Sequence, residues 1–165
     1  MKRSRTELIG IYLNDHLAGA TVGTELAHRI ARHHDEVADR ATLQRLAVEI
    51  NADRRALLEI MALLGVPVRH YKTTAAWLGE RAGRLKLNGR LRTRSPLSSL
   101  EELELIRLGV EGKAAGWRTL RELADTEPQL NKAWLDELLD RARSQADLLE
   151  DLRVRAVHHL IEVTG

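Results

Sequence analysis

Apolar residues recur every three or four positions through most of the chain, which is the spacing of one face of an α-helix. Gly65 ends the second apolar stretch and Pro67 follows it, as is common just beyond a helix. Abundant Leu, Ala, Glu and Arg, with only 3 prolines and no phenylalanine, also favour helices over strands. The pattern predicts four long helices, at about residues 5–34, 41–64, 98–125 and 126–161.

Capping signals mark the expected starts of the last two helices. The stretch "SSLEE" offers Ser98 or Ser99 as an N-cap, with a glutamate three residues further on to complete a capping box. The stretch "TEPQ" offers Thr126 as a cap, with Pro128 in the first turn. We therefore expect the third helix to begin at 98 or 99 and the fourth at 126.

The lengths of the connections predict how the helices are arranged. The first and last connections are short, so helices one and two, and helices three and four, should form antiparallel hairpins. Segment 66–98 is much longer and should cross the bundle, with a short amphipathic helix at 74–85. We expect an all-α fold: a single domain over 1–165 that is an antiparallel four-helix bundle with one long crossover carrying a short extra helix.

Composition narrows the cellular setting. The 165 residues include no cysteine, which excludes disulfides and thiolate chemistry and fits a cytoplasmic location. The chain has no apolar run of the roughly 18 residues that a membrane span needs, and the basic N-terminus lacks the apolar core of a signal peptide. The net charge of +2 is too small to make nucleic acid the default partner.

One polar residue interrupts the apolar stripe of each predicted helix: His16, Asp53, Lys113 and Gln145. Each lies near the middle of its helix, so an antiparallel bundle should bring all four to about the same height. Burying a lone charge costs several kcal/mol, so Lys113 should have an anionic partner. Asp53 is the best-placed partner, with Glu49 at the edge of the same stripe. The pattern therefore predicts a buried polar layer.

Small residues fill the first helix beside this layer, in the stretch "AGATVGTELAHR". Gly19 and Gly23 are four positions apart on the face that should point inward. Paired glycines at this spacing allow another helix to approach closely. We therefore expect close helix packing at these two glycines.

Two sequence motifs carry a resemblance to a known family. Helix two contains "EINADRRALLEIMALLG" at 49–65, which ends in a Leu-Leu-Gly turn, and helix three contains "KAAGWRTLRELAD" at 113–125, with an aromatic residue followed by x-Thr-Leu. Together with the helix lengths, these motifs resemble a small bacterial branch of the ferritin-like superfamily. The resemblance implies a layer in which such proteins hold two metals with glutamates and Glu-x-x-His pairs.

This chain departs from that ligand pattern. Glu49 stands where helix two would offer a carboxylate, but Ala52 replaces the histidine three residues on. Lys113 stands where helix three would offer a glutamate, and an ammonium group can pair with the carboxylates that a metal would otherwise need. The resemblance therefore implies a degenerate metal site converted into a buried lysine–carboxylate network. The expected function is a non-catalytic binding or assembly module without a cofactor, most simply a homodimer, whose protein partner the sequence does not name.

Two alternatives remain open. In the first, the chain is a working di-metal protein that binds iron or manganese through Glu49, Asp53, Glu102 and Asp147, and whether it is an enzyme stays open with it. In the second, the basic segment 81–94 binds nucleic acid or another anionic surface through Arg90, Arg92 and Arg94. The segment lacks interleaved aromatic residues for base stacking, so pairing with acidic helix faces or a dimer contact explains its charge equally well.

Overall fold

The computed structural model describes residues 4–34, 37–69 and 96–164, and in these parts of the chain it contains helices and no strands. The segment 70–95 is outside the described residues. The predicted crossover, its short helix at 74–85 and the basic segment 81–94 therefore stay predictions. The helical elements are α1 (Arg5–His33), the short 3-10 turn η1 (Val37–Asp39), α2 (Arg40–Leu63), α4 (Pro96–Leu123) and α5 (Lys132–Thr164).

Both ends of the first hairpin follow from local chemistry. The Ser4 hydroxyl accepts a hydrogen bond of 3.2 Å from the backbone N–H of Glu7, which caps the start of α1. At the end of α2, Gly65 has φ +64°, the left-handed conformation that glycine adopts most easily. The Val66 N–H then donates back to the Met61 carbonyl over 2.8 Å, as in a Schellman motif. The predicted end of the second helix at Gly65 is confirmed.

The start of the fourth long helix differs from the prediction. Helix α5 begins at Lys132 rather than at Thr126. The Asn131 side chain accepts a 3.1 Å hydrogen bond from the Trp134 N–H and serves as the cap, whereas the Thr126 hydroxyl donates to the Leu123 carbonyl at the end of α4. The buried side chain of Leu130 lies between the two helices in sequence, so part of the connection belongs to the core.

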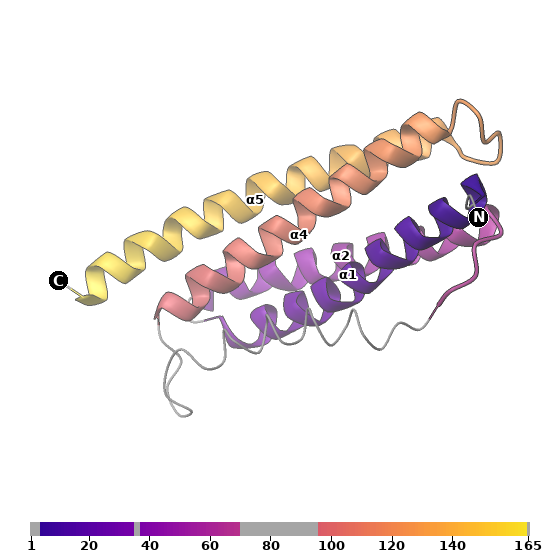
Figure 1. The fold of residues 1–165 in the computed structure, drawn as a ribbon. Coiled ribbons are helices and arrows are strands. Elements are labelled where there is room, and N and C mark those ends of the chain that lie inside the picture. The colour runs from indigo at the N-terminus through magenta and orange to yellow at the C-terminus, as the bar shows by residue number, and fades with distance from the viewer. Residues whose placement is uncertain (1–3, 35–36, 70–95, 165) are drawn as a thin grey trace.

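The helices form two antiparallel hairpins, α1/α2 and α4/α5, stacked against each other (Figure 1). Helix α1 also lies along α4, and the backbones of α1 and α4 approach each other more closely than those of α2 and α5. Helix α2 ends and α4 begins at opposite ends of the molecule (Figure 1). The described helices thus agree with the expected four-helix bundle.

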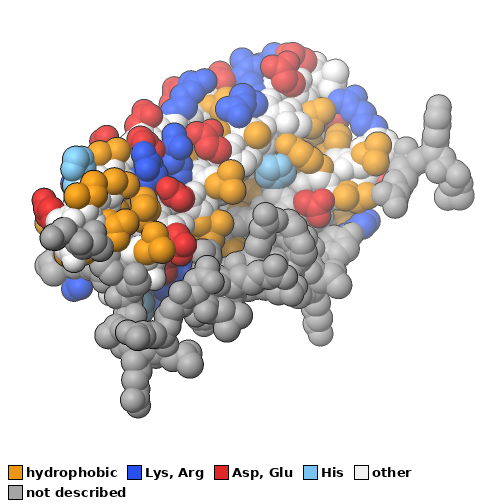
Figure 2. All heavy atoms as spheres, turned by 60° about the vertical axis from the view of Figure 1, so that its left-hand side comes forward, with side chains coloured by type: hydrophobic (Ala, Val, Ile, Leu, Met, Phe, Trp, Pro, Cys, Tyr) orange, Lys and Arg blue, Asp and Glu red, His pale blue; other side chains and the backbone are white. Residues whose placement is uncertain are grey.

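The core runs along the centre of this arrangement and receives buried leucine, isoleucine and methionine side chains from all four long helices. Most charged side chains of the described residues lie outside it: Figure 2 shows blue and red groups gathered along the upper edge, over the α4/α5 hairpin, with hydrophobic groups below. None of the described helices is apolar enough over a sufficient length to cross a lipid bilayer. Fully buried members of the core include Leu13, Ile30, Leu46, Ile60, Met61, Leu103, Leu120, Leu135 and Leu149.

Candidate functional site

Three of the four residues predicted to form a polar layer, Asp53, Lys113 and Gln145, meet at the middle of the bundle around Lys113 of α4, whereas the fourth, His16, does not join them. The Lys113 ammonium donates a 2.5 Å hydrogen bond to Oδ2 of Asp53 on α2 and a second one to Oε1 of Gln145 on α5. The lysine side chain is 16% exposed and the Asp53 side chain only 2%. The predicted pairing of Lys113 with Asp53 therefore exists, and it joins the two hairpins through the core.

A second cation, Arg141 of α5, pairs with the same carboxylate. Its Nε donates to Oδ1 of Asp53 over 2.7 Å, while Oδ2 accepts from both Lys113 and Gln145. Sequence reasoning missed this arginine, because it lies at the edge of the apolar stripe of α5 and not within it. The signal that could have found it is its position one helical turn before Gln145, where a long side chain can reach inward.

Gln145 completes the layer as a bridge between two carboxylates. Its side-chain N–H group donates to Glu49 over 3.1 Å and to Asp53 over 3.2 Å, while its oxygen accepts from Lys113. Gln145 is 1% exposed, whereas Glu49 is exposed at the surface. We call Glu49, Asp53, Lys113, Arg141 and Gln145 the ionic layer.

Burial lowers the pKa of Lys113 below the ordinary lysine value, and the nearby Asp53 carboxylate opposes that shift. Arg141 lowers the lysine pKa further by charge repulsion, and Glu49 raises it. Desolvation is the largest cause, as expected for an ammonium group placed in a mostly apolar interior. The layer therefore holds two cations around one buried carboxylate, with the second carboxylate at the surface.

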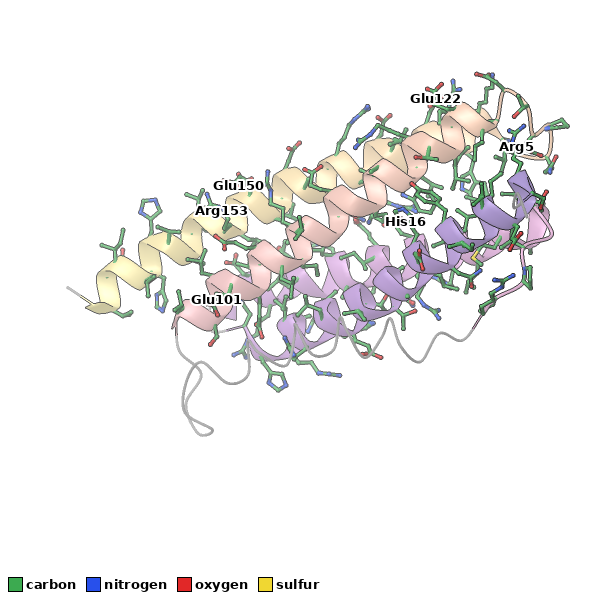
Figure 3. All side chains as sticks on the ribbon, in the orientation of Figure 1. Arg5, His16, Glu101, Glu122, Glu150 and Arg153 are labelled. Carbon is green, nitrogen blue, oxygen red and sulfur yellow. The ribbon has the colours of Figure 1, made fainter. Side chains whose placement is uncertain are left out.

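His16 of α1 lies beside the ionic layer but makes no hydrogen bond to it among the described contacts. Figure 3 shows His16 between α1 and α4. Its ring meets the Tyr12 ring edge-on at 4.5 Å between centroids and lies over Gly116, where an added Cβ would be 3.1 Å from the imidazole. Burial lowers the pKa of His16, and Asp15 partly opposes the shift. His16 is therefore packed against an aromatic ring and a glycine rather than bonded into the layer.

The two ends of the α1/α4 seam fix how these helices face each other. The Tyr12 hydroxyl bonds the Thr119 hydroxyl over 3.0 Å, and Arg29 pairs with Glu102 over 3.3 Å. Arg29 follows Tyr12 by seventeen residues on α1, and Glu102 precedes Thr119 by seventeen residues on α4, so the two helices are antiparallel with one constant register. The same register places Gly19 level with Gly112, and Gly23 level with Leu108 and Gly109.

The predicted close packing at Gly19 and Gly23 is wrong. Among the described residues, a Cβ added at Gly19, Gly23, Gly109 or Gly112 would meet no atom within 4 Å outside its own helix. In the part of the chain that the structure describes, nothing fills the space beside these four glycines, although the contacts at Tyr12 and Arg29 join the two helices. Only Gly116 is tightly packed, against His16.

The result is a groove of about 820 Å³ between α1 and α4, which we call the glycine groove. Its walls are mostly apolar, and the polar groups that reach it come from a few residues on three helices. Trp117 contributes to its lining while being 2% exposed, and its buried indole N–H has no hydrogen-bond partner among the described residues. The polar and charged lining residues are Tyr12, Asp15, His16, Asp53, Arg54 and Lys113.

The alternative metal ligands are spread over the bundle. Glu102 pairs with Arg29, more than two helical turns from Lys113, and Asp147 is exposed on α5. Among the described residues, no three His, Cys, Asp or Glu side chains are grouped so that they could hold a metal ion. Arg90, Arg92 and Arg94 lie outside the described residues, so their role as anion ligands stays a prediction.

Comparisons with protein-family models, with curated proteins and with solved structures found no match for this chain.

Proposed function

We propose that the protein is a non-catalytic, ferritin-like helical bundle that acts as a binding or assembly module. In this proposal the ionic layer stands where ferritin-like proteins hold two metal ions. The observation that carries it is the state of Asp53: this buried carboxylate already accepts hydrogen bonds from Lys113, Arg141 and Gln145. A carboxylate paired with two cations has little negative charge left for a metal.

The charge balance supports the same proposal. A di-metal site needs several carboxylates to neutralise its cations. Here one buried carboxylate faces two basic side chains, and the other carboxylate of the layer, Glu49, is exposed. The ammonium of Lys113 takes the central position that a metal would otherwise occupy.

The helix arrangement supports the ferritin-like part of the proposal. Helices α2 and α4 run in the same direction, and the end of one lies far from the start of the other (Figure 1). Two hairpins joined in this way need one connection that runs the length of the bundle, as in ferritin-like folds. An up-down-up-down bundle would place those two ends together.

Elemental analysis tests the proposal directly. Protein purified without chelator, and the same protein incubated with excess Fe²⁺ or Mn²⁺ and then desalted, should both contain far less than one metal ion per chain. A recruited metal would also compete with Lys113, so a matched Lys113→Glu variant, which adds a carboxylate to the layer, is the control in which weak metal retention is expected. Two metal ions per chain in the native protein would overturn the proposal and favour the di-metal alternative.

We also propose that the module is a homodimer that works in the cytoplasm. Large apolar side chains remain exposed on separate helices, among them Val48 on α2 and Leu108 on α4. A second copy is the simplest partner that would cover such residues. Light scattering during size-exclusion chromatography should give twice the mass of the chain over a range of concentrations. A constant monomer mass would remove the dimer from the proposal.

A further inference from the structure

The glycine groove has the properties of a small-molecule site, which deepens the proposed binding function and rests on it. Its volume of about 820 Å³ lies within the usual range of ligand pockets, about 300 to 1,000 Å³. The lining is mostly apolar, with a small number of polar groups from α1, α2 and α4. Sites of this composition bind the body of a ligand by apolar contact and its polar end by a few directed hydrogen bonds.

The groove stays open for a reason that is built into the helices. Gly19 and Gly23 on α1, and Gly109 and Gly112 on α4, lack the side chains that would fill the seam. The Tyr12–Thr119 and Arg29–Glu102 contacts join the two helices on either side of these glycines and fix their register. The space between is elongated along the helix axes, which suits a ligand with an extended body.

The ammonium of Lys113 favours an anionic end group at the groove. The Lys113 ammonium has three N–H groups. Two of them donate to Asp53 and Gln145, and the described residues offer no acceptor to the third. The lining carries two basic side chains, Lys113 and Arg54, and two acidic ones, Asp53 and Asp15. Asp53 is already bonded to Lys113 and Arg141, so the ammonium of Lys113 is the group that can still bind an anion.

Two further observations point to a ligand at this place. The buried indole N–H of Trp117 has no partner among the described residues, and a buried donor without an acceptor costs free energy. Asp15, the other acidic residue of the lining, is exposed to solvent and therefore opposes an anion only weakly. Lys113 would attract an acceptor group that is bound in the groove. The lining of the groove also includes Trp117.

We propose that the glycine groove binds an aliphatic monocarboxylate, with its carboxylate on Lys113 and its alkyl chain along the four glycines of α1 and α4. The carboxylate would accept from the third N–H group of Lys113, for which the described residues offer no acceptor. The alkyl chain replaces water along the apolar walls and is thin enough to fit between two helices that carry no side chains there.

Calorimetric titration of the full chain tests this with three probes of equal chain length: decanoate and decyltrimethylammonium below their micelle concentrations, and decan-1-ol below its solubility limit. Decanoate should bind saturably with one molecule per chain. It should bind about tenfold more tightly than decan-1-ol, because a charge-assisted hydrogen bond contributes more than a neutral one. The cationic probe should bind more weakly than both.

Three variants place the ligand in the groove. Gly19→Leu and Gly112→Leu put a side chain into the open seam and should each weaken decanoate binding at least about tenfold. The matched control is Ala133→Leu, which adds the same side chain at an exposed position of α5 outside the groove and should leave binding unchanged. In a chain with Trp77 and Trp134 replaced by Phe, decanoate should change the fluorescence of the remaining Trp117.

Lys113→Met tests the head group separately. It should bind decanoate and decan-1-ol with affinities within about twofold of each other, because the charge that separates them is gone. Should this variant not fold, the double variant Lys113→Met/Asp53→Leu removes the charge without leaving a buried carboxylate and serves the same comparison.

The outcomes separate this inference from the proposed function. No saturable binding of decanoate, equal affinity for acid and alcohol in the native protein, or unchanged binding in Gly19→Leu would each overturn the inference. None of these results bears on the metal content, so the proposed function would stand. Stoichiometric metal in the native protein would instead overturn the proposed function, whatever the groove binds.

Discussion

The two hairpins of this bundle meet along two seams that differ in what fills them. Along the α2/α5 seam the backbones are farther apart, and the side chains of Glu49 and Asp53 on α2 meet the long side chains of Arg141 and Gln145 on α5. Along the α1/α4 seam the backbones are closer, yet facing glycines leave a groove of about 820 Å³. The separation of two helices therefore does not decide whether the space between them is filled. Whether the space is filled depends on the length of the side chains that face each other.

The two seams also treat a polar residue differently. Lys113 turns toward the α2/α5 seam, where a carboxylate and an amide meet its ammonium group. His16, at a similar height on α1, packs against an aromatic ring and a glycine and has no hydrogen bond among those found between the described residues. Burial lowers the pKa of both side chains, but only the lysine has an ionic partner on another helix to oppose that shift. The following substitutions test this contrast.

The largest effect should come from Asp53→Leu. The substitution leaves Lys113 and Arg141 next to each other without the carboxylate that both contact, and removing one partner of a buried ion pair costs about 3 to 5 kcal/mol. Urea unfolding followed by circular dichroism measures the loss. The double variant Asp53→Leu/Lys113→Met should recover much of it, and a double variant as unstable as the single one would show that the α2/α5 seam does not depend on the ion pair.

Lys113→Met alone should be milder, at about 1 to 3 kcal/mol. Arg141 and Gln145 remain bonded to Asp53 in this variant, so the buried carboxylate keeps two of its partners. The free energy of unfolding from urea titration gives the comparison with Asp53→Leu. If Lys113→Met costs more than Asp53→Leu, the second cation does not stabilise the carboxylate as the contacts indicate.

Alanine substitutions at the glycines of the α1/α4 seam should raise the stability of the protein rather than lower it. Gly19→Ala and Gly23→Ala add a Cβ that meets nothing within 4 Å. Each should stabilise the protein by about 0.5 to 1 kcal/mol, because alanine favours a helix over glycine by that amount. Gly116→Ala is the matched control, since its Cβ would lie 3.1 Å from the His16 ring, and it should stabilise less or destabilise. Thermal unfolding of the three variants distinguishes an open seam from a packed one.

The smallest predicted effect is the pH dependence that His16 gives to the stability of the protein. Burial lowers its pKa in the folded protein, so as the pH falls below about 6.5 the unfolded chain takes up the proton before the folded one does. This histidine therefore makes the protein less stable as the pH falls. The unfolding free energy of the native protein minus that of His16→Gln should decrease as the pH is lowered from about 7.5 to about 5. A difference that grows on acidification would mean that His16 gains an anionic partner when protonated.

Much of the fold follows from the order of residues alone. The helix periodicity of apolar positions gave the four long helices, and the Gly65 turn ends α2 where the sequence placed it. The start of α5 was placed six residues early, because Thr126 and Pro128 offer a capping pattern that competes with Asn131. Local signals of similar strength cannot be ranked without knowing that Leu130 is buried.

For the candidate site too, some residues could be predicted from the sequence and others could not. Asp53, Lys113 and Gln145 could be predicted to meet because each interrupts an apolar stripe, and a buried charge must find a partner. Arg141 could not, because a long side chain reaches the core from outside the stripe.

What the sequence by itself determined is which faces of the helices are apolar and which polar residues interrupt them, since both depend on helix periodicity alone. Only the tertiary structure decided that Gly19 and Gly23 face open space. The reason is physical: a glycine permits a close approach but does not cause one. The contacts at the two ends of the α1/α4 seam join residues that are 107 positions apart for Tyr12 and Thr119 and 73 apart for Arg29 and Glu102, so helix periodicity alone could not place them.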